Sequence, residues 1–437
     1  MLLRFSFENF RSFRKKTTLN MIATSQRTMD YTLIKNGKYR ILPAAVLYGA
    51  NASGKSNVIL AMSTLCYIIE NGSLSFLQNH YLSNLEIMPF LHDNNKEPIS
   101  FEVEFVTGKD HFIYCLTFNV EPLEANGKRF ISEEKLEKVM SRETVMLFHR
   151  TKNNITIGKD EKVLRILKYE NESVIQNLVD RLVQNMDEKA LFLTGGFKST
   201  IRREIADKIT DFFTKKVAAI MNLAALSPYI EAIIEPNNGE STDGIMISEA
   251  LFNRVIKAAD FGPQNIAWRA GEQNKHGISK LEMTSLYGNV LIPSDLMESM
   301  GTVRLLRFSL ILKQFIDEGG ILMIDEMDNA IHPEIMKGII ALFGNQEVNT
   351  KGAQLVFTSH NPVFMDNKLL RRDQILFTER DPNSYDSSLY SLADFGSIAV
   401  RNDQSLMQNY FKGRYGKLPY IDLETVLTHS MEGDYEC

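Results

Sequence analysis

Cysteine is scarce in this sequence, and long hydrophobic runs are missing. The three cysteines, Cys66, Cys115 and Cys437, are too few and too widely spaced for a disulfide framework or a zinc ribbon, and they are typical of a reducing compartment. No stretch approaches the ~18 uninterrupted apolar residues that a membrane-spanning helix needs. Glu8 interrupts the first residues before an apolar signal-peptide centre can form. We therefore expect a cytoplasmic protein with no membrane partner.

A strong excess of either charge is also lacking. Lys and Arg number 49 against 54 Asp and Glu, which gives a net charge of -5. A surface that binds DNA nonspecifically needs a local excess of Lys and Arg. The near-equal numbers of positive and negative residues therefore argue weakly against such a surface, but they still allow a local basic patch. The 44% apolar and 24% charged residues are ordinary for a globular protein, which excludes a collagen, a disordered tail or a coiled-coil rod.

Hydrophobic periodicity predicts an α/β protein. At roughly 150 residues per domain, the 437 residues correspond to about three units. Alternation predicts strands in the first third, with a hairpin between Ser100 and Asn119 whose tip is Lys109-Asp110. Ile201, Ile205 and Ile209 recur at helical spacing. We predict an N-terminal lobe over 1–165, a mainly helical insertion over 166–285 and a C-terminal lobe with an extension over 286–437.

The strongest motif runs from Gly49 to Ser56 and matches Gly-x4-Gly-Lys-Ser/Thr. Its glycines let the backbone wrap around phosphates, its N–H groups point at phosphate oxygens, and the following helix adds positive partial charge. Lys55 can reach the β- and γ-phosphates, and Ser56 can ligate Mg²⁺. A chance match in a chain of this length is roughly 1 in 100. The expected nucleotide-binding residues are Gly49, Asn51, Ala52, Ser53, Gly54, Lys55, Ser56 and Asn57.

A second motif places two acids after a buried strand. The apolar run Ile321–Ile324 is followed by Asp325 and Glu326. Adjacent carboxylates at a strand end are costly unless a cation sits there. Asp325 would hold the Mg²⁺ shell and Glu326 would polarise the attacking water. Taken alone, the pattern also fits an ordinary acidic turn; the phosphate loop favours the catalytic interpretation.

Two weaker motifs indicate a function mainly because of where they lie in the chain. Phe357-Thr358-Ser359 ends a predicted strand just before His360, where an imidazole can hydrogen-bond the γ-phosphate. Ser299 and Gly301 stand at the start of an amphipathic run, where a hydroxyl and an amide form an anion cradle. A plain helix cap is the alternative for Ser299.

Together these motifs resemble the ATP-binding-cassette ATPases, and more narrowly their SMC/RecF-like branch, which carries Asn after the phosphate-loop Gly-Lys-Ser, here Asn57. The chain is most similar to the stand-alone bacterial AAA15/AAA21 ATPases of abortive-infection and anti-phage systems, such as the AbiL-, RloA- and AriA-type proteins. The segments that carry this resemblance are 9–13, 48–51, 298–302, 325–333, 358–360 and 410–419.

The resemblance implies a P-loop ABC-type ATPase head with a helical insertion that uses ATP and Mg²⁺ and acts as a homo-oligomer of ATP-sandwich dimers. Ser299 and Gly301 would contact the γ-phosphate held by a second copy, and Asp328 would sit at the same interface. The expected role is the regulatory ATPase of an anti-phage system that controls a toxic effector encoded nearby. The chain departs from the wider pattern in its Ser-Met-Gly signature, and Gln78 is the only nearby candidate for the usual glutamine.

The sequence leaves other functions open. A RecF-like ATPase acting on DNA in repair is the alternative, and a nucleic-acid partner stays open because cations line one side of the helical segment: Lys198, Arg202, Arg203, Lys208, Lys215 and Lys216. An ordinary solvated helix face explains these cations equally. A fused nuclease is disfavoured, since fewer residues follow His360 than the roughly 100 that such a domain needs. The segment 410–419 fits either a docking element or C-terminal packing.

Overall fold

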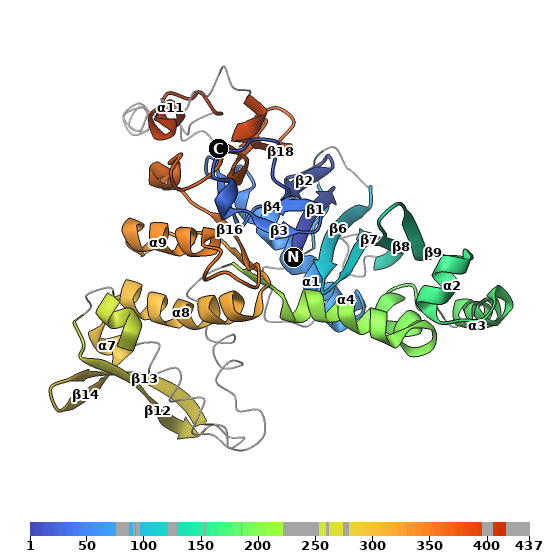
Figure 1. Ribbon diagram of the computed structural model, residues 1–437, viewed down its shortest axis with the longest axis horizontal. Coiled ribbons are helices and arrows are strands. Elements are labelled where there is room, and N and C mark those ends of the chain that lie inside the picture. The colour runs from blue at the N-terminus through green and yellow to red at the C-terminus, as the bar shows by residue number, and fades with distance from the viewer. Residues whose placement is uncertain are drawn as a thin grey trace, which may run out of the picture.

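Two large β-sheets and the helices between them form the framework of the protein, shown as a computed structural model in Figure 1. The structure describes residues 1–75, 87–90, 92, 97–120, 129–152, 154–184, 186–221, 253–258, 262–273, 279–329, 331–395 and 405–416. Gln78 and Cys437 lie outside these residues, while Cys66 and Cys115 are free thiols.

The first sheet is antiparallel and has seven strands in the order β10-β9-β8-β7-β6-β1-β2. Its predicted hairpin is confirmed, but the tip lies one residue earlier than predicted, at Gly108-Lys109: Thr107 pairs with Asp110, and Gly108 takes a φ of +60° in the turn. The strands are Leu2–Glu8 (β1), Thr17–Asn20 (β2), Ile99–Thr107 (β6), Asp110–Val120 (β7), Arg129–Val139 (β8), Thr144–Thr151 (β9) and Asn154–Ile157 (β10).

The second sheet has six strands in the order β11-β15-β16-β5-β17-β18, and every pair except β17 with β18 is parallel. Ile324 pairs with Phe357, and Thr358 pairs with Leu47, so β15, β16 and β5 end at the same edge. The strands are Ala44–Tyr48 (β5), Val217–Ile220 (β11), Ile321–Ile324 (β15), Gln354–Thr358 (β16), Ile375–Arg380 (β17) and Ser387–Ser391 (β18).

The inner strands β5, β15 and β16 are buried on both faces, which explains why they are mainly apolar rather than alternating. Ala45 and Leu47 belong to the core that also contains helix α1 (Lys55–Asn71) and the antiparallel sheet. Val46 and Tyr48 face the opposite core, which α8 (Met300–Glu318) and α9 (Pro333–Gly344) complete. Figure 1 shows α8 and α9 on the side away from strands β6 to β9.

The remaining elements are shorter. Three strands, Asn265–Gln273 (β12), Ser279–Tyr287 (β13) and Val290–Pro293 (β14), form an antiparallel sheet beside α7 (Ser294–Met297), and Figure 1 shows this sheet extending below α8. The others are Asp30–Thr32 (η1), Ile34–Asn36 (β3), Tyr39–Ile41 (β4), Glu161–Leu167 (α2), Glu172–Gln184 (α3), Leu193–Ile201 (η4, a π-helix), Arg203–Lys215 (α4), Pro362–Phe364 (η6), Arg372–Gln374 (η7), Leu392–Phe395 (η8) and Leu406–Phe411 (α11).

The expected α/β class with a β-rich N-terminal lobe is confirmed, with one difference in detail. Pro43, which cannot donate a ladder hydrogen bond, separates β4 from β5. Among the described residues of 166–285, helical structure covers α3, η4, α4 and 253–258, but β11 joins the parallel sheet and β12 with β13 forms a hairpin, so the segment is not mainly helical throughout these ranges. The lobe boundaries at 165 and 285 stay a prediction. None of the helices in the described ranges has the length and hydropathy needed to cross a membrane.

Candidate functional site

The phosphate-binding motif forms the loop between β5 and α1, and its two glycines are required by close packing. Gly54 has a φ of +110°, and a Cβ there would lie 2.9 Å from the Phe13 ring. Gly49 has a φ of +156°, and a Cβ there would collide with the carbonyl oxygen of Thr378. Ala52 also has a positive φ, of +60°. Only glycine therefore fits at these two positions, and the positive φ angles of Gly49, Ala52 and Gly54 give the loop the curved backbone that wraps around a phosphate.

Lys55 lies inside this loop. Its Nζ donates to the carbonyl oxygens of Gly49 at 2.9 Å and Ala50 at 3.0 Å, and the residue is only 6% exposed. Burial lowers the pKa of its ammonium group, while the nearby carboxylates of Asp325 and Glu326 act in the opposite direction. The loop and the acidic motif, far apart in sequence, thus lie near enough to interact electrostatically, as expected for β5 and β15, which end at one edge on either side of β16.

The two acids after β15 are oriented by one hydroxyl group on β16. Thr358 Oγ1 donates to Asp325 Oδ1 at 2.6 Å and accepts from the backbone N–H of Glu326 at 2.7 Å. Asp325 is 7% exposed, whereas the side chain of Glu326 is exposed. Glu326 has a φ of 48°, an unusual conformation for a residue other than glycine. One carboxylate is therefore fixed and the other faces solvent.

Asp328 ties this acidic turn to the loop after β16. Its Oδ2 accepts from Ser359 Oγ at 2.7 Å and from the backbone N–H of Asn361 at 3.2 Å. His360 stands between these two residues, and it is exposed. Tyr48, the last residue of β5, donates from its hydroxyl group to the Asn361 carbonyl at 3.1 Å. Burial, followed by the negative charge of Asp328, raises the pKa of Tyr48 well above its ordinary value.

Ser299 caps α8. Its Oγ accepts from the backbone N–H of Thr302 at 3.1 Å, so within one chain the helix-cap interpretation describes what it does. Gly301 lies in the first turn of the same helix. Met300 between them is 65% exposed, and Leu296 just before is 80% exposed. The action of Ser299 and Gly301 in trans stays a prediction.

A family comparison covers both halves of this site. The family model described as "AAA domain, putative AbiEii toxin, Type IV TA system" matches residues 44–159 and 201–366, well over half of the chain. The chain belongs to this family. The matched ranges include the phosphate loop of this AAA domain, the acidic motif and His360, and they end before α11.

Solved structures similar to this AAA-family chain include an SmcHead bound to the C-winged helix domain of ScpA. The two sequences are 13% identical, the match covers 89% of this chain and 97% of that chain, and the TM-score is 0.44. The SMC head domain from Thermotoga maritima has 13% identity, coverage of 89% and 98%, and a TM-score of 0.39. The Smc head domain with an extended coiled coil bound to the C-terminal domain of ScpA derived from Pyrococcus furiosus has 13% identity, coverage of 91% and 98%, and a TM-score of 0.41. A search of the curated proteins finds no significant match.

Ser12, Phe13 and Thr378 support the phosphate loop of this AAA domain, but they were not predicted from the sequence as site residues. Asn57 Nδ2 donates to Ser12 Oγ at 2.9 Å, and Phe13 lies against Gly54. Thr378 on β17 hydrogen-bonds with Ser53 at 2.6 Å between their hydroxyl oxygens. The motif 9–13 was visible only as part of the family resemblance, and nothing in the local sequence marks Thr378.

The donor set fits a magnesium ion that shares its shell with phosphates. Ser56 and Asp325 would supply two oxygen ligands, and Mg²⁺ usually binds one or two protein carboxylates together with waters and substrate phosphates. Within the described ranges, no group of three or more His, Cys, Asp or Glu side chains forms a separate metal cluster. A site that relies on nucleotide phosphates needs no such cluster.

The cations of the helical segment are all paired. Each has a carboxylate oxygen at 2.6 to 3.4 Å, which supports the interpretation as a solvated helix face: Lys198 with Asp207, Arg202 with Glu204, Arg203 with Asp207, Lys208 with Asp110, Lys215 with Asp211 and Lys216 with Glu318. A phosphate backbone would have to displace these acids.

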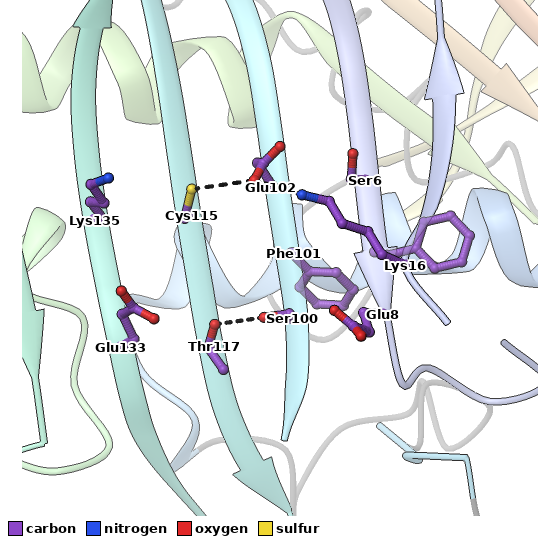
Figure 2. A pocket seen from close by; sticks show the side chains of 11 residues that line it. Ser6, Glu8, Lys16, Ser100, Phe101, Glu102, Cys115, Thr117, Glu133 and Lys135 are labelled. Carbon is purple, nitrogen blue, oxygen red and sulfur yellow. Dashed lines mark hydrogen bonds and ion pairs between the residues drawn. The ribbon is translucent and has the colours of Figure 1, made fainter. Parts of the chain in front are cut away.

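A hollow of about 240 Å³ lies on the antiparallel sheet, and Figure 2 shows its lining from strands β1, β6, β7 and β8. Both of its lysines have acidic neighbours: Lys16 contacts Glu102 at 3.0 Å and Lys135 contacts Glu137 at 2.7 Å. None of the residues that line it belongs to the phosphate loop or the acidic motif. The hollow therefore stands apart from the candidate nucleotide site.

Proposed function

We propose that this protein binds and hydrolyses ATP with Mg²⁺ at the carboxyl edge of its parallel sheet. The observation that supports this most is the convergence of Lys55, Asp325 and Glu326, which follow two strands that both pair with β16. A buried lysine next to a glycine cradle matches a polyphosphate, and an exposed carboxylate beside a buried one matches a base beside a metal ligand.

Each residue would have a separate task in this reaction. The loop N–H groups and Lys55 would bind the phosphates, with Lys55 Nζ exchanging its carbonyl partners for phosphate oxygens. When bound, Mg²⁺ neutralises phosphate charge, and Ser56 with Asp325 would hold it. Glu326 would position the attacking water and accept its proton. His360 would hydrogen-bond the γ-phosphate from the loop after β16.

The experiment that tests nucleotide binding is calorimetric titration of ATP into the Lys55→Ala variant. We expect ATP affinity to fall by about a hundredfold or more, because the charge-assisted contacts to the phosphates disappear. Lys16→Ala is the matched control, since Lys16 pairs with Glu102 on the antiparallel sheet. Unchanged affinity in Lys55→Ala would sink the phosphate-loop assignment.

We further propose that two copies close on ATP, with Ser299 and Gly301 of one copy facing the loop of the other and Asp328 at the junction. The exposed apolar side chains of Leu296 and Met300 beside Ser299 support this, since exposed apolar clusters mark interaction surfaces. ATP would then hold the pair together, and hydrolysis would release it. The assembly would be a homo-oligomer built on such dimers.

The biological role that we propose is regulation of a toxic effector in an anti-phage system. The family description names a putative AbiEii toxin and a Type IV TA system, which favours a toxin-linked role. The test is co-purification of Glu326→Gln with the products of adjacent genes, with ATP and without nucleotide. A nucleotide-dependent protein partner would support regulation, whereas recovery of the ATPase alone with bound DNA would favour the repair function.

A further inference from the structure

The described part of the C-terminal segment, 405–416, folds back onto the edge of the parallel sheet. We call these residues the tail clasp. Ser405 caps α11 by accepting from the backbone N–H of Gln408 at 3.3 Å, and Leu406 is 2% exposed. Tyr415 is 1% exposed, and its hydroxyl oxygen accepts from Asn409 Nδ2 at 3.0 Å. The tail clasp is thus anchored at both ends, and it lies beyond the range matched by the family model.

Tyr410 is the contact between this clasp and the candidate site. Its ring is stacked on Phe377 of β17, with centroids 6.1 Å apart and planes at 21°. The Tyr410 centroid also lies 5.9 Å from that of Tyr48, the residue before the phosphate loop. Phe377 and Tyr48 are themselves 6.2 Å apart, so the three rings form one cluster. Aromatic pairs at such distances stabilise a defined geometry beyond simple burial.

A chain of hydrogen bonds runs from this cluster to the acidic motif. Tyr48 donates to the Asn361 carbonyl, and the N–H of Asn361 donates to Asp328 Oδ2 at 3.2 Å. Helix α11 also packs directly against η6, which begins one residue after Asn361. The clasp therefore supports the His360 loop through a side chain and through a helix contact.

We propose that Tyr410 is a positioning residue that holds Tyr48 and the loop 359–364, and through them His360 and Asp328, in the arrangement needed for hydrolysis. It does so without touching the reacting atoms. The effect of Tyr410 on the rate of ATP hydrolysis rests on the proposed ATPase function. Its effect on the ordering of residues 359–364 does not. Because small displacements of catalytic groups are costly, loss of the ring lowers turnover, while the phosphate loop still binds ATP.

The test compares four proteins: the unaltered chain, Tyr410→Ala, Tyr410→Phe and, as a matched control on the same helix, Phe411→Ala. Phe411 is 60% exposed, and its ring lies 5.9 Å from that of Tyr410, so its truncation removes one neighbour of Tyr410 but leaves the Tyr410 contacts with Phe377 and Tyr48 in place. Two quantities are measured, amide hydrogen exchange of residues 359–364 without nucleotide, and kcat and KM for ATP. Tyr410→Leu replaces Tyr410→Ala if the alanine variant does not fold.

We expect Tyr410→Ala to speed exchange at 359–364 by about tenfold and to lower kcat by about ten- to a hundredfold with KM changed less than twofold. Tyr410→Phe should restore both quantities, because the ring and not the hydroxyl makes the stack. Phe411→Ala should match the unaltered protein. Exchange at 359–364 that does not change in Tyr410→Ala or Tyr410→Leu overturns the inference. If the unaltered protein does not hydrolyse ATP, the proposed function fails, while the exchange result still decides the inference.

Discussion

The hydroxyl group of Thr358 joins the two acids of the candidate site, because it donates to Asp325 Oδ1 at 2.6 Å and accepts from the backbone N–H of Glu326 at 2.7 Å. Its single proton is committed to Asp325, so the N–H of Glu326 meets an oxygen lone pair. The turn after β15 is therefore aligned to β16, and the positive φ of Glu326 is held by this bond.

Replacing Thr358 should separate catalysis from binding. In Thr358→Val the shape is kept but both hydrogen bonds are lost, which leaves a buried carboxylate oxygen and an N–H without this partner. We expect ATP hydrolysis to fall by about ten- to a hundredfold and the free energy of unfolding to fall by about 1–3 kcal/mol, with ATP affinity within about threefold. Steady-state kinetics and urea unfolding measure these effects. Thr358→Ser should restore both values, and an equally impaired serine variant would contradict the role of the hydroxyl.

Gly54→Ala tests the packing behind the phosphate loop. A Cβ at this position would lie 2.9 Å from the Phe13 ring and 3.0 Å from Ser12 Oγ, at a φ of +110°. We expect a loss of about 2–4 kcal/mol in the free energy of unfolding, from strain and steric overlap together, and a loss of ATP binding. Gly37→Ala is the control, because Gly37 also has a positive φ, of +55°, but open space around the Cβ position. Equal losses in the two variants would show that the clash plays no part.

The sequence predicts those parts of the site that are local in the chain. The phosphate loop, α1 and the strand before Asp325 each have their own pattern of glycines, apolar runs or acids, and all three lie where they were predicted. β11 was missed because Val217–Ile220 is a four-residue apolar run directly after a strong helix. Such a short run does not distinguish a strand from the end of a helix.

The supporting contacts could not be predicted because they depend on register and on distant segments. Thr358 reaches Asp325 only because Ile324 pairs with Phe357, which a sequence pattern does not specify. The ring cluster combines Tyr48, Phe377 and Tyr410, which come from three separate parts of the chain. The motif 410–419 could be recognised in the sequence. Its composition fits a docking element and simple C-terminal packing equally, so the sequence does not distinguish the two.

Glu104 gives a prediction for pH dependence. A hydrogen bond from His111 at 3.0 Å and then the Arg4 guanidinium at 2.6 Å lower the pKa of Glu104 from its ordinary value of 4.5. Because the folded-state pKa is depressed, the unfolded chain binds more protons below about pH 4.5, and the stabilisation is lost as the pH falls through the folded-state value.

We therefore expect Glu104→Gln to lower the free energy of unfolding by about 1 kcal/mol at pH 7, and by close to zero at pH 3. Denaturant unfolding at several pH values measures the difference between variant and unaltered protein. Glu102→Gln is the control on the same strand, since its ion pair with Lys16 is exposed and should contribute little. A Glu104→Gln effect of equal size at both pH values would rule out a contribution from the charge.

Met300→Glu tests the dimer interface that we propose. Met300 is 65% exposed in one chain and lies between Ser299 and Gly301, so a second copy that approaches this helix start would bury it. A glutamate there would place an uncompensated negative charge against the bound nucleotide or the partner. We expect the ATP-dependent dimer of Glu326→Gln to weaken by at least about tenfold when Met300→Glu is added, with ATP affinity of the single chain unchanged.

Sedimentation of the double variant with and without ATP measures this effect. Val348→Glu is the matched control, because Val348 is also an exposed apolar residue, at 42%, but follows α9 away from the signature. The same dimer in all three proteins would mean that the start of α8 is not buried between copies. In that case Ser299 has only its local role as a helix cap, and the γ-phosphate contact must come from other residues.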